Sequence, residues 1–357
     1  MKKFLSLVLV TFFTVSYNAF AQEEESSKPE LSISGSVDAY YRANLNASNS
    51  LLTPDADGDY NTYIAPTSSF ANKPGFALGM ANVILGLEGK KTGFVADLVF
   101  GPRGTDAVFG STTASSSIVN QLYAYWNVSE AVTLTIGNFN TFLGYEVISP
   151  TGNYNYSTSY MFSYGPFSHS GLKADFSFGD VTAMLAVMNP TDATDFNPSG
   201  DYVLGAQLGY GGAYLNFIYS DDFYQVDLTA GWDLTDALYL GVNATKAKDS
   251  FSGAALYLQN SFSDSFSLGL RGEYFKDEAG LAIAADESVI DLTLSANYSI
   301  GNLTLIPEFR MDMLSYDDGY ILKGDQTYDA NGNISGIANA ELGKSLSSFT
   351  LAAVYAF

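Results

Sequence analysis

Cysteine is absent from this chain of 357 residues, and charged residues are scarce. Without cysteine there is no disulfide framework, so the fold must be stable without covalent cross-links. Charged residues make up 15% of the chain, whereas ordinary soluble domains carry about a quarter. Beyond the N-terminal segment no run of eighteen or more apolar residues occurs, so we expect no membrane-spanning helix.

Basic residues are the rarer charged group, with 16 Lys and Arg against 38 Asp and Glu, and the formal net charge is −22. So acidic a chain lacks the basic surface that nucleic acid requires, and no nucleic-acid partner is expected. The acidic surplus either keeps the loops soluble or has a functional role, and the sequence leaves both readings open. Tyrosine, phenylalanine and glycine are abundant instead, with 25, 25 and 33 residues. This composition is typical of a β-rich protein with many turns.

The N-terminus has the three parts of a secretory signal peptide. A short basic start, Met1-Lys2-Lys3, precedes an apolar stretch from Phe4 to Tyr17, and Ala19-Phe20-Ala21 forms a cleavage site. We therefore predict a signal peptide over 1–21, a flexible lead over 22–30 and one domain over 31–357. No cysteine follows the cleavage site, which argues against a lipoprotein, and loss of the two lysines would take the net charge to −24.

The domain reads as a succession of segments in which apolar and polar residues alternate, the period of a β-strand. In the last segment, Phe349, Leu351 and Tyr355 fall on one face, and Thr350 and Ala352 on the other. We predict sixteen such strands, at 31–45, 76–89, 93–101, 117–128, 131–140, 168–178, 181–190, 202–210, 213–221, 223–234, 237–247, 253–263, 266–276, 288–300, 303–313 and 348–357.

Tight connections of two or three residues alternate with longer ones, the short link at 221–222 being the weakest case. The longer connections are expected at 46–75, 102–116, 141–167, 191–201, 277–287 and 314–347. Short turns at one end, long loops at the other and an even strand number are typical of an outer-membrane barrel. The sequence therefore predicts an all-β fold, a transmembrane antiparallel up-and-down β-barrel of about 16 strands with both termini periplasmic. A soluble all-β protein with the same period is the alternative.

The last strand must pair with the first, because hydrocarbon offers no partner to an open sheet edge. Its apolar file is expected to face lipid, with Phe357 at the periplasmic interface, where aromatic rings favour the water–lipid boundary. A terminal aromatic after alternating apolar residues also resembles the signal read by barrel-assembly machinery, which we therefore expect as a partner.

Three segments resemble the OmpL-like outer-membrane β-barrel porins that are common in Bacteroidota. They are GNFNTFLGYEVISPTGNYNYSTSYMFSYGPFSHSGLKADF (137–176), IVNQLYAYWNVSEAVTLTIGNF (118–139) and MNPTDATDFNPS (188–199). The resemblance spans most of the mature chain and implies a water-filled pore in the cell outer membrane for passive diffusion of small hydrophilic solutes or ions. The alternative is a non-conducting surface barrel, acting as an adhesin or structural protein. On either reading we expect outer-membrane lipid around the barrel, and the protein to be a monomer or a trimer.

Charged residues in a membrane-spanning strand must face water or pair with one another. They either stiffen the wall or set the selectivity of the pore. The predicted pore-lining residues are Asp38, Arg42, Glu88, Asp97, His169, Lys173, Asp175, Asp227, Arg271, Glu273, Glu308, Arg310 and Asp312.

The connection from Asn140 to Phe167 is rich in Tyr and Asn. By analogy with general porins it folds inward and narrows the lumen; the alternative is an external cap. An inward loop would present five residues to the permeating solute, and their aromatic and amide groups suit uncharged, hydroxyl-rich solutes. These residues are Tyr145, Glu146, Asn153, Tyr154 and Tyr156.

No cofactor is expected, although two acidic loops resemble the start of a calcium loop. Asp55-Ala56-Asp57-Gly58-Asp59 and Asp329-Ala330-Asn331-Gly332-Asn333 place oxygen ligands at alternate positions, but the sixth position is not glycine and no glutamate closes either loop.

No enzymatic activity is expected either. His169 is the one histidine of the sequence; Ser168 and Ser170 beside it point the opposite way, and no G-x-S-x-G motif occurs.

Overall fold

The structure, a computed structural model, describes residues 30–54 and 57–357. The predicted signal peptide and nearly all of the predicted lead lie outside the described residues, as does the first part of the loop at 55–59. Within the described residues no helix is both long and apolar enough to cross a membrane.

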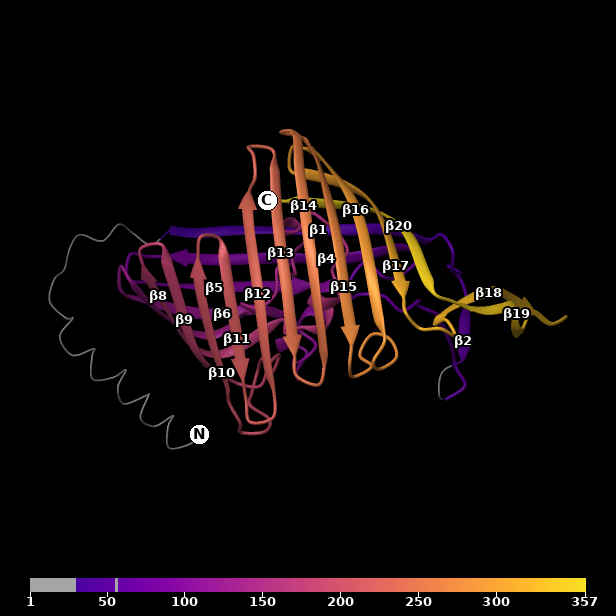
Figure 1. Ribbon diagram of the computed structural model, residues 1–357, viewed down its shortest axis with the longest axis horizontal. Helices are drawn as coiled ribbons and strands as arrows, with labels where there is room; N and C mark the ends of the chain where they lie inside the picture. The colour runs from indigo at the N-terminus through magenta and orange to yellow at the C-terminus, as the bar shows by residue number, and fades with distance from the viewer. Residues whose placement is uncertain (1–29, 55–56) are drawn as a thin grey trace.

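Sixteen antiparallel strands close into a barrel (Figure 1), which confirms the predicted fold class. Neighbours in sequence are neighbours in the sheet, and the last strand pairs with the first. The barrel strands are β1 (Glu30–Asn44), β4 (Gly75–Glu88), β5 (Thr92–Phe100), β6 (Val119–Ser129), β7 (Val132–Asn140), β8 (Ser168–Phe178), β9 (Val181–Met188), β10 (Val203–Tyr210), β11 (Ala213–Tyr219), β12 (Tyr224–Asp233), β13 (Leu238–Ala247), β14 (Phe251–Ser263), β15 (Phe266–Asp277), β16 (Ser288–Ile300), β17 (Leu303–Leu314) and β20 (Ser345–Ala356).

The residues that alternate in sequence point alternately to the outside and to the inside of the barrel. In β16 the side chains of Ile290, Leu292 and Leu294 are 45%, 40% and 46% exposed, whereas Asp291 and Thr293 are fully buried. Apolar residues therefore cover the outer surface and polar residues point inward, the reverse of a soluble barrel. A soluble all-β protein would instead bury its apolar side chains, so the inward-facing polar side chains favour the membrane barrel over the soluble alternative.

The C-terminal strand closes the barrel along its length. β20 pairs with β1 from Ser36↔Ala356 to Asn44↔Ser348 and with β17 on its other side. At the end of the chain, Phe357 and Gly35 exchange two main-chain hydrogen bonds of 3.0 Å. The chain therefore ends in paired strand, as the alternation predicts.

Two short hairpins in the long connections were not predicted from the sequence. They are β2 (Leu52–Pro54) with β3 (Tyr60–Thr62), and β18 (Ile321–Tyr328) with β19 (Ile334–Gly343). The second projects beyond the barrel at the long-loop end (Figure 1). Gly324 and Gly336 interrupt its apolar pattern and both have positive φ, so the alternation that marks the barrel strands is missing here.

The remaining elements are short helical turns in the loops: α2 (Pro102–Ala107), η2 (Ser116–Ile118), η3 (Pro150–Gly152) and α3 (Tyr160–Tyr164).

Candidate functional site in the barrel interior

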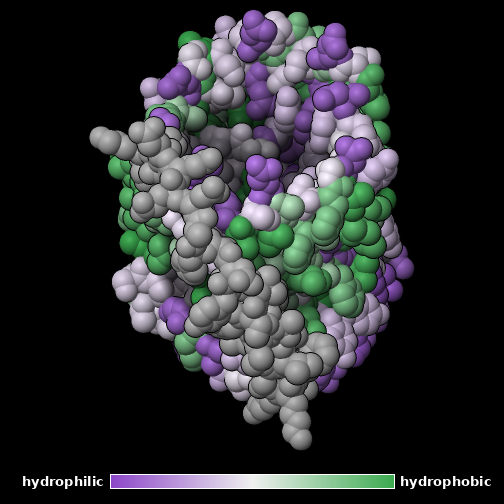
Figure 2. Space-filling model, turned by 90° about the vertical axis from the view of Figure 1, so that its left-hand side faces the viewer, coloured by the Kyte–Doolittle hydropathy of each residue, from purple (hydrophilic) through white to green (hydrophobic). Residues whose placement is uncertain are grey.

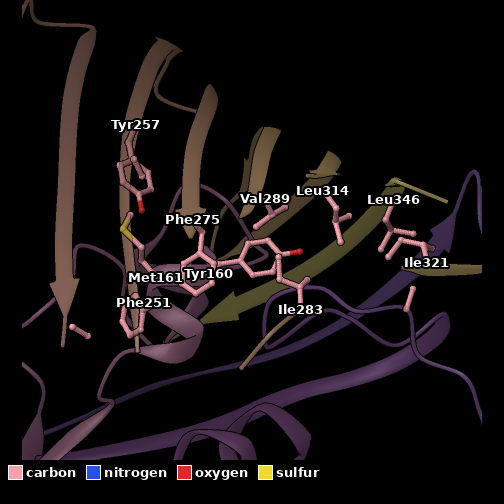
Figure 3. Close-up of a cluster of buried hydrophobic side chains, with 13 residues drawn as sticks. Tyr160, Met161, Phe251, Tyr257, Phe275, Ile283, Val289, Leu314, Ile321 and Leu346 are labelled. Atoms are coloured by element: carbon pink, nitrogen blue, oxygen red, sulfur yellow. The ribbon is translucent and has the colours of Figure 1, made fainter. Parts of the chain in front are cut away.

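The third long connection, residues 141–167 (loop 3), enters the barrel and lies against its inner wall. Main-chain and side-chain groups of loop 3 bind wall strands far away in sequence: Tyr156 N–H donates to Glu308 Oε2 of β17 at 2.6 Å, and Asn155 Nδ2 donates to Ser295 Oγ of β16 at 2.8 Å. The α3 turn packs its Tyr160 and Met161 among buried side chains of the wall (Figure 3). Of the two alternatives left open by the sequence, loop 3 takes the inward one.

Glycines in the wall make room for loop 3. A Cβ atom at Gly241 of β13 would lie less than 3.0 Å from the ring of Tyr145, and one at Gly269 of β15 would lie 2.8 Å from Tyr154 Cβ. Real Cβ atoms do not approach other atoms so closely, so any other residue at these positions would push loop 3 away. Glycine inside a strand commonly marks such a close approach.

Buried carboxylates receive the main-chain N–H groups of loop 3. Glu308 accepts from Tyr156 and Ser157 at 2.6 and 3.1 Å. Glu273 of β15 accepts from Tyr160 and Met161, each at 2.7 Å. Hydrogen bonds to an ionised acceptor are stronger than neutral ones, so the two wall glutamates anchor the segment 156–161.

Two wall arginines bind the carbonyl groups of the same segment. Arg271 Nη1 donates to Ser157 O at 2.7 Å and pairs with Glu146 Oε1 at 2.7 Å. Arg310 Nη1 donates to Thr158 O at 2.7 Å.

Both guanidinium groups also pair with wall carboxylates. Arg271 Nη2 lies 2.7 Å from Asp291 Oδ2, and Arg310 Nη2 lies 2.8 Å from Asp312 Oδ1. The side chains of these two pairs are at most 2% exposed. Each of these four buried charges therefore has an opposite charge beside it, the condition under which buried charges are tolerated.

Most predicted pore-lining residues lie within this packed interior and not beside open space. Ten of them are no more than 8% exposed: Asp38, Arg42, Asp97, His169, Asp227, Arg271, Glu273, Glu308, Arg310 and Asp312. Three are accessible: Glu88 is exposed at the tight-turn end of β4, and the side chains of Lys173 and Asp175 are 25% and 40% exposed.

The five predicted constriction residues divide into two groups. Tyr145, Asn153 and Tyr154 line a cavity of about 330 Å³ between loop 3 and the wall strands β13 and β14, which we call the loop 3 cavity. Tyr156 and Glu146 are buried: the Tyr156 hydroxyl donates to Asp38 Oδ2 at 2.5 Å, and Glu146 pairs with Arg271 although it reaches the cavity edge.

A second interior cavity, of about 400 Å³, lies between the start of loop 3 and the inner face of β6–β10. We call it the lateral cavity. The side of the barrel seen in Figure 2 is hollowed and partly lined by hydrophilic residues. The lateral cavity is lined by Gln121, Tyr123, Tyr125, Thr133, Thr135, Phe139, Asn140, Phe142, Lys173, Asp175, Met184 and Gln207.

A third cavity, of about 260 Å³, lies on the long-loop side of loop 3 and includes Asp192. Asp192 Oδ1 accepts the N–H groups of Phe167 and Ser168 at 2.8 and 2.9 Å, which ties the fourth long loop to the end of loop 3. Burial raises the pKa of Asp192 to about 6, although these two hydrogen bonds lower it.

The raised pKa of Asp192 predicts a pH-dependent stability. Because the folded pKa exceeds the ordinary value of about 3.9, the stabilisation by this group is complete below about pH 4 and is lost as pH rises through about 6. The Asn side chain of Asp192→Asn stays neutral at every pH. The free energy of unfolding of this variant should therefore rise relative to that of wild type by about 2–3 kcal/mol between pH 4 and pH 8. Urea unfolding in detergent at both pH values measures this.

Asp195→Asn is the control for Asp192→Asn. Hydrogen bonds from Ser116 and Thr112 hold the pKa of Asp195 at about 2, so this carboxyl stays ionised throughout pH 4–8. Its replacement should leave the pH dependence over that range unchanged. An equal pH dependence in wild type and Asp192→Asn would contradict the assignment.

Three charged residues of the interior were missed from the sequence: Asp277, Asp291 and Arg103. Asp277 lies in the same inward file of β15 as Glu273. Asp291 lies in the same inward file as Thr293, so the alternation carried its signal. Arg103 of α2 carried none, because it lies in a loop: Arg103 Nε donates to Ile148 O at 2.8 Å, and its guanidinium carbon lies 4.6 Å from the centre of the Phe70 ring. The second long loop thus supports loop 3 from the other side.

His169 is fully buried, and its Nε2 lies 3.0 Å from Thr141 Oγ1 between the rings of Phe139 and Phe142. Ser170 instead donates to Asn138 Oδ1 and Thr194 O. His169 therefore packs against the residues at the start of loop 3.

The loop at 329–333 uses its carboxylate to close a turn. Asp329 Oδ1 accepts the N–H groups of Asn331 and Asn333 at 2.8 and 2.9 Å. Among the described residues no group of three or more His, Asp or Glu side chains is placed to hold a metal ion.

The chain matches one protein family by sequence and many β-barrels of known structure. A family model described as "beta-barrel porin-2, OmpL-like" matches residues 30–357. No curated protein matches the chain.

Among solved structures, OmpF of Salmonella typhi in complex with daunomycin is 11% identical, with a TM-score of 0.55 over 92% of this chain and 98% of that one. OmpT of Vibrio cholerae is 11% identical, with a TM-score of 0.47 over 94% and 100%. A mutant porin of Rh. blastica is 13% identical, with a TM-score of 0.47 over 92% and 100%. At this identity the OmpF similarity supports the barrel fold alone.

Proposed function

The chain belongs to the OmpL-like beta-barrel porin family, and from this premise we propose that it lets small hydrophilic solutes or ions cross the outer membrane passively around loop 3. The observation that carries the proposal is the pair of polar interior cavities, of about 330 and 400 Å³, beside an anchored loop in a closed barrel. A sixteen-stranded barrel is wide enough for an aqueous lumen, and loop 3 fills only part of it.

We place the long loops outside the cell and both termini in the periplasm, as in other outer-membrane barrels. Outer-membrane lipid surrounds the apolar outer face, and barrel-assembly machinery reads the C-terminal strand. The protein acts as a monomer or trimer. The proposed function needs neither a cofactor nor a catalytic residue.

Planar-bilayer recordings test this function. We expect single-channel conductance and a modest preference for cations, because the mature chain is strongly acidic and Arg271 and Arg310 are buried in ion pairs, away from the solution. The preference should weaken as KCl rises, since the Debye length is about 8 Å at physiological salt and shorter above it.

The sign of the reversal potential under a KCl gradient gives the selectivity. No conductance above background would favour the non-conducting adhesin or structural barrel. An anion-selective potential would keep the pore and show that accessible basic groups such as Lys173 set its field.

A further inference from the structure

We propose that the lateral cavity binds uncharged, hydroxyl-rich ring solutes of monosaccharide size, and so defines the substrate class of the porin. The inference rests on the proposed function, because a solute reaches this cavity through the lumen. The cavity volume of about 400 Å³ lies near the lower end of the 300–1,000 Å³ range of small-molecule sites.

Aromatic side chains give the cavity apolar surfaces. Tyr123 and Tyr125 of β6 are half-buried, as is Phe142 at the start of loop 3, and all three line the cavity. Phe142 is fixed by the wall, since a Cβ atom at Gly205 of β10 would lie 2.9 Å from Phe142 Cζ. The C–H face of a sugar ring packs against such aromatic faces while its hydroxyl groups point to the rim.

Two glutamine side chains supply hydrogen-bonding groups that are not fully used. Gln121 Oε1 accepts Asn140 N–H at 3.2 Å, which leaves the Gln121 amino group for a ligand. Gln207 Nε2 donates to Asn216 Oδ1 at 2.7 Å, which leaves the Gln207 carbonyl oxygen. An amide has two donors and two acceptor sites, so one such bond does not saturate it.

Asn140 is a further polar residue of the lateral cavity. Its Oδ1 atom is buried and has no hydrogen-bond partner among the described residues. Buried polar atoms are normally paired. The atom has almost no exposed surface in this structure, so a hydroxyl group of a bound solute satisfies it only if the Asn140 side chain turns toward the cavity.

The charges in the cavity cancel. Lys173 Nζ lies 2.9 Å from Asp175 Oδ2 and 5.5 Å from the centre of the Phe139 ring. A charged solute would have to compete with this internal ion pair for either partner, whereas a neutral solute accepts from the ammonium and donates to the carboxylate without separating them. The paired charges therefore favour an uncharged ligand.

The asparagine amides of the loop 3 cavity are already hydrogen-bonded, although the hydroxyl of Tyr257 in its lining has no hydrogen-bond partner among the described residues. Asn153 exchanges two hydrogen bonds with the main chain of Val147, and Asn155 Nδ2 binds Ser295 Oγ and Gly269 O. These two asparagine amides hold loop 3 in place. This difference makes the lateral cavity the better binding site and the loop 3 cavity a matched control.

Binding of D-glucose to the full barrel in detergent tests the inference, measured by saturation-transfer NMR so that the readout does not depend on conductance. We expect a millimolar dissociation constant, because a channel must release what it binds. Gln207→Leu and Tyr123→Leu should each weaken binding at least tenfold. Gln259 of β14 lines the loop 3 cavity, and Gln259→Leu should leave glucose binding unchanged. KCl conductance and heat-modifiable migration in SDS verify that each variant is folded.

Several outcomes would overturn the inference. If the barrel conducts KCl but binds no glucose, the site is wrong and the porin stands. Loss of binding in Gln259→Leu with none in Gln207→Leu would move the site to the loop 3 cavity. Tighter binding of gluconate or glucosamine than of glucose would refute the uncharged class. Absence of conductance would refute the proposed function and, with it, the substrate class.

Discussion

Replacing Glu273 and Glu308 together by glutamine should at least double the single-channel conductance while leaving the barrel folded. The two carboxylates accept four main-chain N–H groups of loop 3, from Tyr156, Ser157, Tyr160 and Met161. A hydrogen bond to a charged group contributes about 1.5–3 kcal/mol. Glutamine keeps the shape but presents an amino group to one of each pair of N–H donors, so the anchored segment should detach and widen the lumen.

The control for this variant removes two carboxylates that do not hold loop 3. Glu88 and Glu130 are both exposed at the tight-turn end of the barrel, so their double replacement by glutamine changes the net charge equally. We expect its conductance to stay near that of wild type. Faster entry of larger sugars into liposomes, seen with the first variant alone, would separate a wider lumen from an altered field.

An unchanged conductance in a folded Glu273→Gln/Glu308→Gln barrel would show that loop 3 does not limit the current or is held by other contacts. The arginines would then be the remaining candidates, since Arg271 and Arg310 bind the carbonyl groups of the same segment.

The strands of this fold are predictable because their environment is nearly uniform. Hydrocarbon outside and polar groups inside force a period of two on every barrel strand, and β16 shows it directly, with Leu292 and Leu294 outside and Thr293 inside. The hairpin β18–β19 lies outside that environment, and its sequence carries no such pattern. The barrel strands could be predicted because lipid and water impose the alternation on them, and the hairpin β18–β19 could not because it lies outside the membrane.

The seating of loop 3 could be predicted only in part. Its anchors are main-chain groups: Tyr156 N–H meets Glu308 across 152 residues of sequence, and a main-chain N–H has no residue-specific signal. The wall glutamates were visible as inward charges, but the sequence could not show that loop 3, and not water, would meet them. Gly241 and Gly269 did carry a signal, since glycine in a strand interior suggests a close approach.

Deleting residues 349–357 should abolish the folded barrel. β20 pairs with β1 over nine residue positions and with β17 over eleven, so the deletion removes most of both ladders. The remaining edges would face hydrocarbon with unpaired N–H and C=O groups, each costing several kcal/mol. In cells we expect the truncated chain to be degraded or retained in the periplasm, with no form that resists SDS before heating.

Phe357→Ala separates closure of the barrel from recognition of the terminal aromatic ring. The hydrogen bonds between residue 357 and Gly35 are main-chain bonds and survive the substitution. If the ring serves recognition by assembly machinery, Phe357→Ala should insert poorly in cells yet refold in detergent micelles, whereas the truncated chain should fail in both. A truncated chain that inserts normally and migrates as a compact band before heating would contradict closure by β20, because two open strand edges would then be tolerated in the membrane.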